Sequence, residues 1–398
     1  MSDSAHARYR ERLEALRSGE VVLAAVNAAA VEWSGEWDPD HCGRWIRTYG
    51  RFDPDGQPYA LLVFSSRDNP AALCRVEVFD ERSRDVQGRL FDAGPAGWIR
   101  VSPFTTDPCL PTLHAVLALS ADIAVIRYRP FRRCTLRVST DTRTSFAKVY
   151  PDARGQRIYD ESLLLEDAVG RRELRFRVAR SERWDSSRMT LWQETLSGNS
   201  LPRPLLGAAA PRLARQIGEA LGSLTVSSVR PREIFDASAQ QARTARYCAR
   251  LSAIAPGISP MTTALLQQLS LLSARRPSMP LAPIHGAAHP KQWLVDGTTL
   301  GLVDFDRLSW GEPELDLATF VTALEFDEGA YRADELIAEA VSGFEAVARP
   351  VDLTRLHVYR LHKHVAKAYR AAVDLHPHGD RKMMRILEEA ERRLVKAA

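Results

Sequence analysis

Lysine is rare in this sequence, and cysteine is sparse and widely spaced. Six of the 54 lysine and arginine residues are lysine, so 48 are arginine. The five cysteines include no C-x-x-C pair, which argues against a disulfide framework and against a structural zinc site. No apolar run approaches the roughly 20 residues needed to span a bilayer. Residues 1–20 carry charges throughout and lack the apolar segment of a signal peptide, so we expect a cytoplasmic protein that binds no membrane.

The remaining composition is that of an ordinary globular protein. The chain has 398 residues, of which 45% are hydrophobic and 26% are charged. That is enough to bury a core in two or three structural units, and the chain is too apolar for disorder. The net charge of +4 is mild and spread along the chain, so it gives no indication of a nucleic-acid partner.

Strand-like and helix-like segments follow one another in blocks. Runs rich in Val, Phe and Leu, separated by Asp, Gly and Pro turns, predict a first group of strands over 57–101. Three more strands with polar turns follow over 124–151, then a helix over 155–171 and further strands. From residue 207 onward the spacing of the apolar residues is helical, apart from a strand-like interruption at 283–310.

This order predicts an α+β protein in three parts. We expect an α+β N-terminal module over residues 1–115, in which no motif indicates a role. A small β-rich lobe with one helix, here the N-lobe, is expected over 120–200. A helical lobe with a small β-hairpin inside it, here the C-lobe, is expected over 201–398. No internal repeat or low-complexity linker is visible.

Two aspartates stand at the end of a strand within the interruption. In LGLVDFDRL (300–308), four apolar residues lead to Asp304 and Asp306. Side chains two residues apart in a strand point the same way, so both carboxylates can serve one metal ion, because hard cations prefer oxygen ligands. A pair of turn aspartates that caps the following loop explains this stretch equally well.

The residues around this stretch favour the metal site. Three separated blocks, HGAAHPKQWL (285–294), DFD (304–306) and GEPELDLA (311–318), keep one order and spacing. In these blocks the sequence resembles the family of aminoglycoside phosphotransferases and choline kinases, whose pattern is His-Gly-Asp-x-His-x-x-Asn, Asp-Phe-Asp and Gly-Asp-Pro-x-x-Asp-Leu-Ala. The resemblance covers about residues 125–375. It implies a bilobal protein-kinase-like fold that follows the N-terminal module.

The family pattern implies roles for residues of this chain. By the resemblance, Asp304, with Asp306 beside it, would bind the Mg²⁺ that accompanies ATP (or GTP), as in kinases generally. Gln292 stands at the second metal ligand, normally asparagine, and its amide oxygen can still coordinate. His285 and His289 would be scaffold residues of the catalytic loop.

Ala287 is the clearest departure from the family pattern. The family has at this position the aspartate that orients the acceptor hydroxyl and accepts its proton, and alanine can do neither. Phosphoryl transfer relies mainly on positioning and electrostatics, so some activity can survive, but we expect a loss of several orders of magnitude. Asp306 is the nearest carboxylate in sequence that could replace the base. Asp316, in the third block, resembles the buried aspartate that ties the loop backbone together.

One lysine of this lysine-poor chain lies where the family has its nucleotide-binding lysine. Lys148 falls in a strand-like run after two candidate strands, and kinases use a lysine on the third strand to contact the α- and β-phosphates and to pair with a helix glutamate. Glu161 and Glu166 lie in the following helix; the spacing does not decide between them, and we choose Glu161. Residues 192–201, which include Glu194, resemble the hinge that meets the adenine ring.

Arginines gather between the first two strands of the N-lobe, in IRYRPFRRC (126–134). The family has its phosphate-covering loop at this place, and guanidinium groups suit phosphate. The segment contains no glycine, however. A surface face of salt bridges explains these arginines at least as well.

These residues favour two candidate functions. The first is an ATP- and Mg²⁺-dependent O-phosphotransferase that acts on a small-molecule or peptide hydroxyl. The second is a pseudokinase that keeps nucleotide binding and acts as a binding or scaffold protein, which Ala287 and Gln292 favour. A third possibility is a fold adapted to bind a leader peptide through residues 1–115. The expected partners are a nucleotide and a hydroxyl substrate, without nucleic acid; the sequence does not indicate the acceptor or the oligomeric state.

Overall fold

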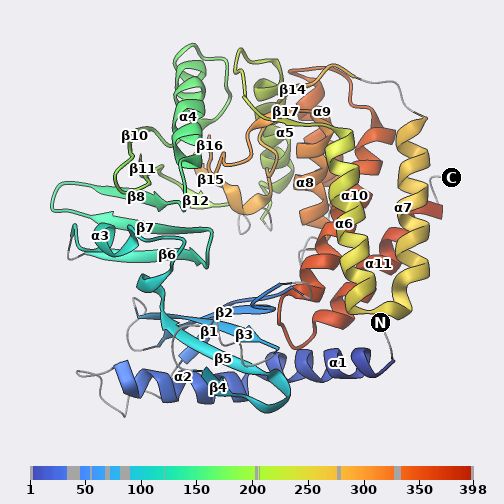
Figure 1. The fold of residues 1–398 in the computed structure, drawn as a ribbon. Coiled ribbons are helices and arrows are strands. Elements are labelled where there is room, and N and C mark those ends of the chain that lie inside the picture. Colours follow the sequence, from blue (N-terminus) through green and yellow to red (C-terminus); the bar gives the residue numbers. More distant parts are fainter. Residues whose placement is uncertain are drawn as a thin grey trace.

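The computed structural model describes residues 3–33, 45–53, 56–67, 72–80, 90–120, 122–201, 205, 207–275, 279–326 and 333–395. These described residues form two five-stranded antiparallel sheets followed by a helical part (Figure 1). The N-terminal module and the N-lobe hold one sheet each, and the C-lobe holds most of the long helices. Within the described residues, no helix combines the length and the apolar character that crossing a membrane requires.

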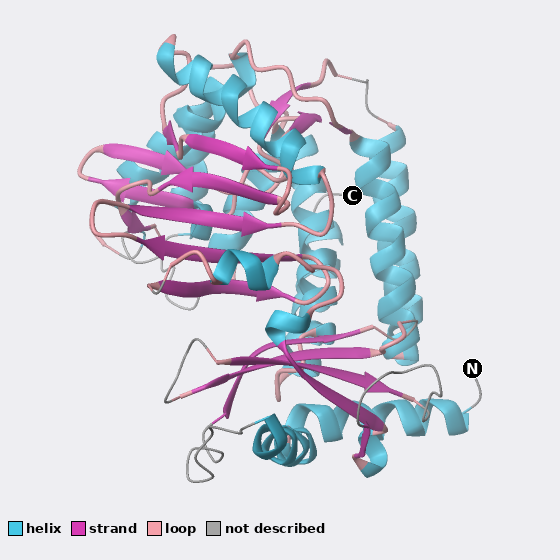
Figure 2. Cartoon of the chain, turned by 60° about the vertical axis from the view of Figure 1, so that its left-hand side comes forward, coloured by secondary structure: helices cyan, strands magenta, loops and turns pink. Residues whose placement is uncertain are grey.

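The N-terminal module is an antiparallel sheet with two helices on one face. The strand order is β1-β2-β3-β5-β4, and apolar side chains of the sheet and of both helices form one core. Figure 2 shows that the helices lie on the side of the sheet that faces away from the N-lobe. The elements are α1 (Asp3–Ser18), α2 (Glu20–Trp33), β1 (Trp45–Phe52), β2 (Ala60–Ser66), β3 (Leu73–Phe79), β4 (Leu90–Asp92) and β5 (Trp98–Pro103), followed by the short α3 (Leu113–Leu117).

The N-lobe is a second antiparallel sheet, in the order β10-β11-β8-β7-β6, with one long helix. Cys134, Leu136 and Val138 of β7 are buried, whereas Arg137 between them is exposed. This alternation is typical of a strand with one buried face. The elements are β6 (Ile123–Arg129), β7 (Arg133–Ser139), β8 (Thr144–Val149), α4 (Arg154–Gly170), β9 (Arg177–Val178), β10 (Ser181–Asp185) and β11 (Thr190–Glu194).

The C-lobe packs long helices around a buried apolar core. Side chains cap two of them, since Asp236 accepts a hydrogen bond from the backbone nitrogen of Ala239 and Asp352 from that of Arg355. The helices are α5 (Ala210–Val226), α6 (Ala237–Ile254), α7 (Ser259–Ala274), α8 (Glu314–Glu325), α9 (Ala333–Glu345), α10 (Leu353–Val373) and α11 (Gly379–Val395). Short strands join them: β12 (Asn199–Ser200), β13 (Ile234–Phe235), β14 (Ala282–Ile284), β15 (Trp293–Asp296), β16 (Thr299–Leu302) and β17 (Ser309–Gly311).

The N-terminal module packs against both lobes. Leu375, which follows α10, is buried in the core of the module, and Arg250 of α6 pairs with Asp53 of the module at 3.5 Å. Val63 and Phe104 of the module belong to the core beneath the N-lobe sheet. The module therefore contacts both sides of the molecule rather than hanging from one end.

A buried cluster fixes the turn between β6 and β7. Oδ2 of Asp107, in the module, accepts hydrogen bonds from Tyr128 Oη at 2.7 Å and from the backbone nitrogen of Phe131 at 2.9 Å. The Arg75 guanidinium lies 5.2 Å from the centroid of the Phe131 ring. Phe131 has φ +61°, a left-handed conformation that costs a non-glycine residue about 1–2 kcal/mol. These contacts stabilise that conformation, so the module holds the arginine-rich turn in place.

The structure agrees with most of the expected helices and strands. The strands expected over 57–101 and 124–151 correspond to β2–β5 and β6–β8, and the helix expected over 155–171 corresponds to α4. The sequence gives no clear signal for α2, because EVVLAAVNAAAVEW is almost uniformly apolar and shows little helical periodicity. The residue bounds of the three parts stay a prediction.

Replacing Asp107 by alanine should weaken the attachment of the N-lobe turn. The substitution leaves the Tyr128 hydroxyl and the Phe131 amide without their buried acceptor, so we expect the free energy of unfolding to fall by about 2 kcal/mol, measured by urea denaturation. Asp141→Ala, in the exposed β7–β8 turn, is the matched control. Equal stability of the two variants would contradict the role given to Asp107.

Candidate functional site

The chain between β14 and α8 brings the three motif blocks together. β14 leads into loop 285–289, β15 and β16 form a hairpin, and Asp304 follows β16. Oδ2 of Asp316 accepts a hydrogen bond from the backbone nitrogen of His285 at 2.6 Å, which joins the third block to the first. Gly286 has φ +72°, and a Cβ atom there would lie 2.5 Å from the carbonyl oxygen of Arg307. Glycine is therefore required where the first and second blocks touch.

His285 is a fully buried residue that connects parts of the backbone. Its Nδ1 accepts a hydrogen bond from the backbone nitrogen of Ala287 at 3.2 Å, which leaves Nε2 to donate to the carbonyl oxygen of Val303 at 3.1 Å. Burial lowers the pKa of His285, in agreement with a neutral ring that carries its proton on Nε2. His285 thus ties loop 285–289 to the chain just before Asp304.

Asp304 and Asp306 form one ion cluster with two cations of the N-lobe sheet. Nζ of Lys148, in β8, lies 3.1 Å from Asp304 Oδ1 and 3.2 Å from Asp306 Oδ1. Arg133, at the start of β7, donates to the two carboxylate oxygens of Asp304 at 3.0 and 3.1 Å and also pairs with Asp306. The hydroxyl of Tyr150 donates to Asp306 at 3.3 Å. The expected lysine and the expected aspartates therefore meet across the two lobes.

The charges of this ion cluster stabilise one another. Burial opposes ionisation of Asp304, but the charges of Lys148 and Arg133 outweigh it and hold the pKa of Asp304 well below its usual value. Burial likewise opposes the charge on Lys148, whereas Asp306 and Asp304 raise the pKa of Lys148 above its usual value. The pKa of Arg133 is raised for the same reason. Asp304, Lys148 and Arg133 are thus all ionised at neutral pH.

The carboxylate and amide oxygens around Asp304 are of the ligand type that a hard divalent cation prefers. Asp304 and Asp306 supply carboxylates, and Gln292, whose Nε2 donates to Asp304 Oδ2 at 3.1 Å, has an amide oxygen to offer. No group of three or more His, Cys, Asp or Glu side chains is assembled for a metal within the described part of the chain. A Mg²⁺ ion there would therefore draw further ligands from phosphate or water, and it would compete with Arg133 for Asp304.

A cleft of about 710 Å³ opens beside the ion cluster. Lys148, Asp304 and Gln292 line it, as does Glu194 at the end of β11. Apolar side chains from both lobes complete much of its wall: Ile126, Phe146, Ile158, Leu165, Val178, Leu196, Leu294, Leu302 and Phe305. An apolar cleft with a few charged groups suits a flat ring attached to a charged group.

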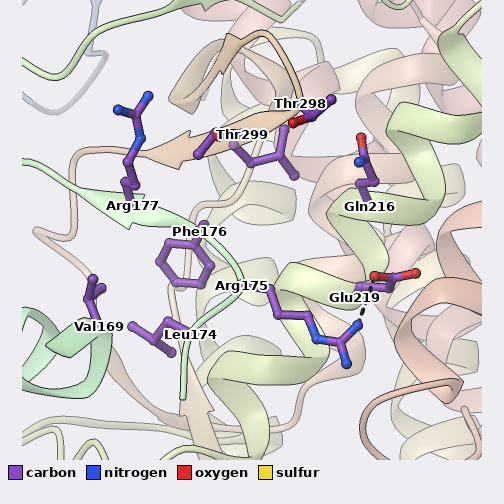
Figure 3. Close-up of a pocket in the computed structure, with 10 residues that line it drawn as sticks. Val169, Leu174, Arg175, Phe176, Arg177, Gln216, Glu219, Thr298 and Thr299 are labelled. Carbon is purple, nitrogen blue, oxygen red and sulfur yellow. Dashed lines mark hydrogen bonds and ion pairs between the residues drawn. The ribbon is translucent and has the colours of Figure 1, made fainter. Parts of the chain in front are cut away.

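A second cavity, of about 320 Å³, lies near β9, β16 and α5. Figure 3 shows Arg175 and Glu219, whose ion pair measures 2.9 Å, on one side of it, with Phe176 nearby. No residue that the sequence indicated for the functional site lines this cavity. We therefore assign the site to the larger cleft.

The expected pair between Lys148 and Glu161 is not formed. Glu161 is buried in α4, where its carboxylate accepts hydrogen bonds from the backbone nitrogen of Arg232 at 3.1 Å and from the side chain of Arg157 at 3.3 Å. The physical reason is competition, because the two aspartates after β16 already supply the carboxylates around Lys148. Glu161 thus supports the position of α4 instead.

The other two glutamates considered for nucleotide binding also have local partners. Glu166 accepts a hydrogen bond from the backbone nitrogen of Ser181 at 2.6 Å, which joins α4 to β10. Glu194 pairs with Arg180 near the surface. Glu194 nevertheless lines the cleft, so its assignment to nucleotide binding stays a prediction.

Loop 285–289 offers no carboxylate where the family has its base. Ala287 is partly buried, and its backbone nitrogen is bonded to His285. Asp306, the expected substitute, is bound by Arg133 and Lys148. Burial, with a further contribution from the positive charge of Arg370, lowers the pKa of His289 to about 4, so His289 is neutral and weakly basic.

Several residues that contribute to the ion cluster, or that support the turn beside it, carried no individual signal in the sequence. Arg133 stood within an arginine-rich segment, but its bonds to Asp304 depend on the fold. Tyr150 stood in the predicted lysine strand without a role of its own, and Asp107 lay in a module without motifs. A chain-wide motif search could not have found them, because their partners lie in distant segments.

The family itself can be decided by comparison with known proteins. A sequence model of the phosphotransferase enzyme family matches residues 135–350, more than half of the chain. This chain belongs to the phosphotransferase enzyme family. The match covers Lys148 and all three motif blocks, and it confirms the resemblance that those blocks indicated. A search of curated proteins gives no significant match.

Solved structures of phosphotransferases share the fold of this family member. Choline kinase LicA from Streptococcus pneumoniae is similar with a TM-score of 0.51 and 12% identity, over 71% of this chain and 96% of that chain. The GDP and kanamycin complex of APH(2″)-IIIa is similar with a TM-score of 0.53 and 13% identity, over 71% of this chain and 97% of that chain. A choline/ethanolamine kinase family protein from Mesorhizobium loti is similar with a TM-score of 0.52 and 15% identity, over 74% of this chain and 96% of that chain. The expected kinase-like α+β fold is therefore confirmed.

His289, a partly buried histidine of loop 285–289, should make stability depend on pH. Below pH 6.5 an unfolded chain protonates this side chain, whereas folded His289, with a pKa of about 4, does not. The free energy of unfolding should therefore fall between pH 7.5 and 5, and His289→Gln should reduce that fall by about 1 kcal/mol. Urea denaturation at several pH values measures it, with the exposed His378→Gln as control. Identical pH profiles for His289→Gln and the wild type would contradict the neutral state of folded His289.

Proposed function

We propose that this phosphotransferase family member is an ATP- or GTP-dependent O-phosphotransferase that acts on a small-molecule or peptide hydroxyl, with Ala287 in the place of the base. The observation that carries the proposal is the meeting of Lys148, Asp304 and Gln292 in one cleft beside loop 285–289. A related fold was solved as a GDP and kanamycin complex, which supports a nucleotide and a small acceptor for this fold.

The residues of the ion cluster would divide the work of binding the nucleotide. Lys148 would contact the phosphates as a buried cation. Asp304, Gln292 and Asp306 would hold Mg²⁺, which supplies neutralisation of charge on the phosphate oxygens. Arg133, once released from Asp304, could donate two hydrogen bonds to a phosphate, since its fork geometry matches phosphate as well as carboxylate. The opposite charges of the ion cluster stabilise one another, and a phosphate and a metal ion would each bring one of these two charges to the site.

The acceptor side would rely on positioning. His285 and Asp316 hold the backbone of loop 285–289, so the loop can present an acceptor hydroxyl even without a base. Ala287 cannot take the proton, and His289 is too weakly basic to do so efficiently at neutral pH. Transfer by this chain is therefore expected to be slow.

A pseudokinase is the second candidate, and a specific observation favours it. Asp306, the carboxylate nearest to Ala287 in the second block, is already paired with Arg133 and Lys148. On this alternative, the chain binds nucleotide for scaffolding and transfers no phosphate. Calorimetry with ATP and Mg²⁺, followed by an assay of ADP release, separates the two: binding without turnover supports the pseudokinase, and acceptor-dependent turnover supports the enzyme.

Lys148→Met should weaken nucleotide binding. The substitution removes the buried cation expected to contact the phosphates, so the Kd for ATP with Mg²⁺ should rise about tenfold or more, measured by isothermal titration calorimetry. Lys382→Met, an exposed lysine of α11, is the matched control and should bind like the wild type. Equal ATP affinity in folded Lys148→Met would refute the assignment of the cleft.

Ala287→Asp should increase phosphoryl transfer. The new carboxylate would stand at the family's base position, where general base catalysis contributes roughly 10²–10⁴-fold. ADP release against a panel of hydroxyl acceptors measures the gain. Ala287→Asn has the same shape but cannot accept a proton, so it serves as the control. If the two variants turn over ATP at the same rate, the base at residue 287 is not what limits this chain.

A further inference from the structure

Six cations around loop 285–289 lack the acidic partners that many other arginines of this chain have. Arg143 pairs with Glu182 at 3.1 Å, for example, and Arg175 with Glu219 at 2.9 Å. By contrast, six described residues near this loop have side chains that form no hydrogen bond or ion pair. They are here called the cationic cluster: Arg127, Arg132, Arg243, Arg307, Lys363 and Arg370. Four of them are exposed and two are partly buried.

The first half of the cationic cluster lies at the interface of the lobes. Arg127 and Arg132 belong to the β6–β7 hairpin, whose turn points toward α6 and α10 (Figure 1). Arg307 follows the aspartates of the ion cluster, and its backbone packs against Gly286 in loop 285–289. Arg132 and Arg307 thus approach the loop from the N-lobe and from the second motif block, whereas Arg127 also lines the cleft beside the ion cluster.

The second half comes from two helices of the C-lobe that pack together. Arg243 of α6 holds its guanidinium 3.9 Å from the centroid of the Phe235 ring. Lys363 and Arg370 lie two helical turns apart on α10, hence on the same face. α10 packs against α8, and α8 contacts Pro290–Gln292, which directly follow loop 285–289. The charge of Arg370 also contributes to the lowered pKa of His289.

The members of the cationic cluster repel one another. Burial and the positive charges of Arg307, Arg370 and Arg243 lower the pKa of Lys363 to about 7, although the negative charge of Asp316 opposes this. Although Arg370 is exposed as a whole residue, protein packed around its guanidinium, together with the charge of Arg307, lowers its pKa, opposed by Tyr247 and Asp374. Neither aspartate forms an ion pair with the cluster within the described residues. Repulsion of this kind destabilises a compact fold, and a bound anion would remove it.

We propose that the cationic cluster binds the acceptor of the phosphotransferase, and that this acceptor is a hydroxyl compound that already carries a phosphate group. The inference rests on the proposed function for the direction of transfer, because loop 285–289 is the acceptor side of the site. Guanidinium groups bind phosphate oxygens through paired hydrogen bonds. A polyamine antibiotic or a quaternary amine would meet like charge from several directions, so such acceptors are disfavoured here.

Titration calorimetry of the full chain with glucose 6-phosphate, in the presence of saturating ADP, tests the proposal. ADP fills the nucleotide cleft, so the phosphate compound cannot bind there. The wild type should bind glucose 6-phosphate but not glucose, kanamycin or choline. Arg243→Gln and Arg370→Gln, on two different helices, should each raise its Kd about tenfold. Arg212→Gln, an exposed and unpaired arginine of α5 among the described residues, should leave the Kd unchanged.

Three results would overturn the proposal. One is unchanged affinity for glucose 6-phosphate in both variants, and another is tighter binding of kanamycin or choline than of glucose 6-phosphate. A third is tighter binding of a single-stranded oligonucleotide, which would assign the cluster to a nucleic acid. Because each substitution removes repulsion, both variants should unfold at the wild-type temperature or higher; a large fall in both would contradict the unpaired state.

Lys148→Met separates this inference from the proposed function. If the variant no longer binds ADP but still binds glucose 6-phosphate, the two sites are distinct and both assignments stand. If the wild type fails to bind ADP, the proposed function fails, while titration of Lys148→Met with glucose 6-phosphate still measures the cationic cluster alone. Loss of glucose 6-phosphate binding in Lys148→Met would show that the phosphate sat in the nucleotide cleft, which would overturn the cluster's assignment.

Discussion

Four charges that meet between the lobes are the constraint on which this structure depends. Lys148 and Arg133 come from neighbouring strands of the N-lobe sheet, and Asp304 and Asp306 come from the chain after β16. Partly buried charges of one sign are costly unless charges of the other sign lie beside them. The register of β7 and β8 and the conformation of the turn after β16 must therefore bring the two cations and the two carboxylates together. The same charges make the cleft suitable for phosphate and metal, since those ligands bring the opposite charges with them.

The N-terminal module acts on this site through packing rather than through a motif. Asp107 and Arg75 hold the turn at Phe131, and that turn leads directly into Arg133. Kinases cover phosphate with a glycine-rich loop; at the corresponding place this chain has an arginine-rich turn, which the separate N-terminal module supports. The described part of the N-terminal module thus has a structural role, because it supports this turn and contacts both lobes.

The two sides of the site differ in charge balance. On the nucleotide side, cations and anions compensate one another within hydrogen-bonding distance. On the acceptor side, the members of the cationic cluster remain unpaired within the described residues, and one of them, Arg127, also lines the cleft. Membership of the phosphotransferase enzyme family does not identify the acceptor, because fold and family leave substrate recognition to local side chains. Charge is therefore the most informative property of the acceptor side.

The sequence by itself indicated the family and the order of sheets and helices, and it singled out Lys148, Asp304 and Asp316 as candidate site residues. These are local signals, carried by periodicity and by motif spacing within single segments. Tertiary structure decided that Lys148 pairs with Asp304 and Asp306 rather than with Glu161, and that Arg133 shares them. It also decided that Asp107 supports a turn in another part of the chain and that six cations gather without acids. The reason is physical: which charges meet depends on packing between distant elements, and sequence spacing carries no record of that packing.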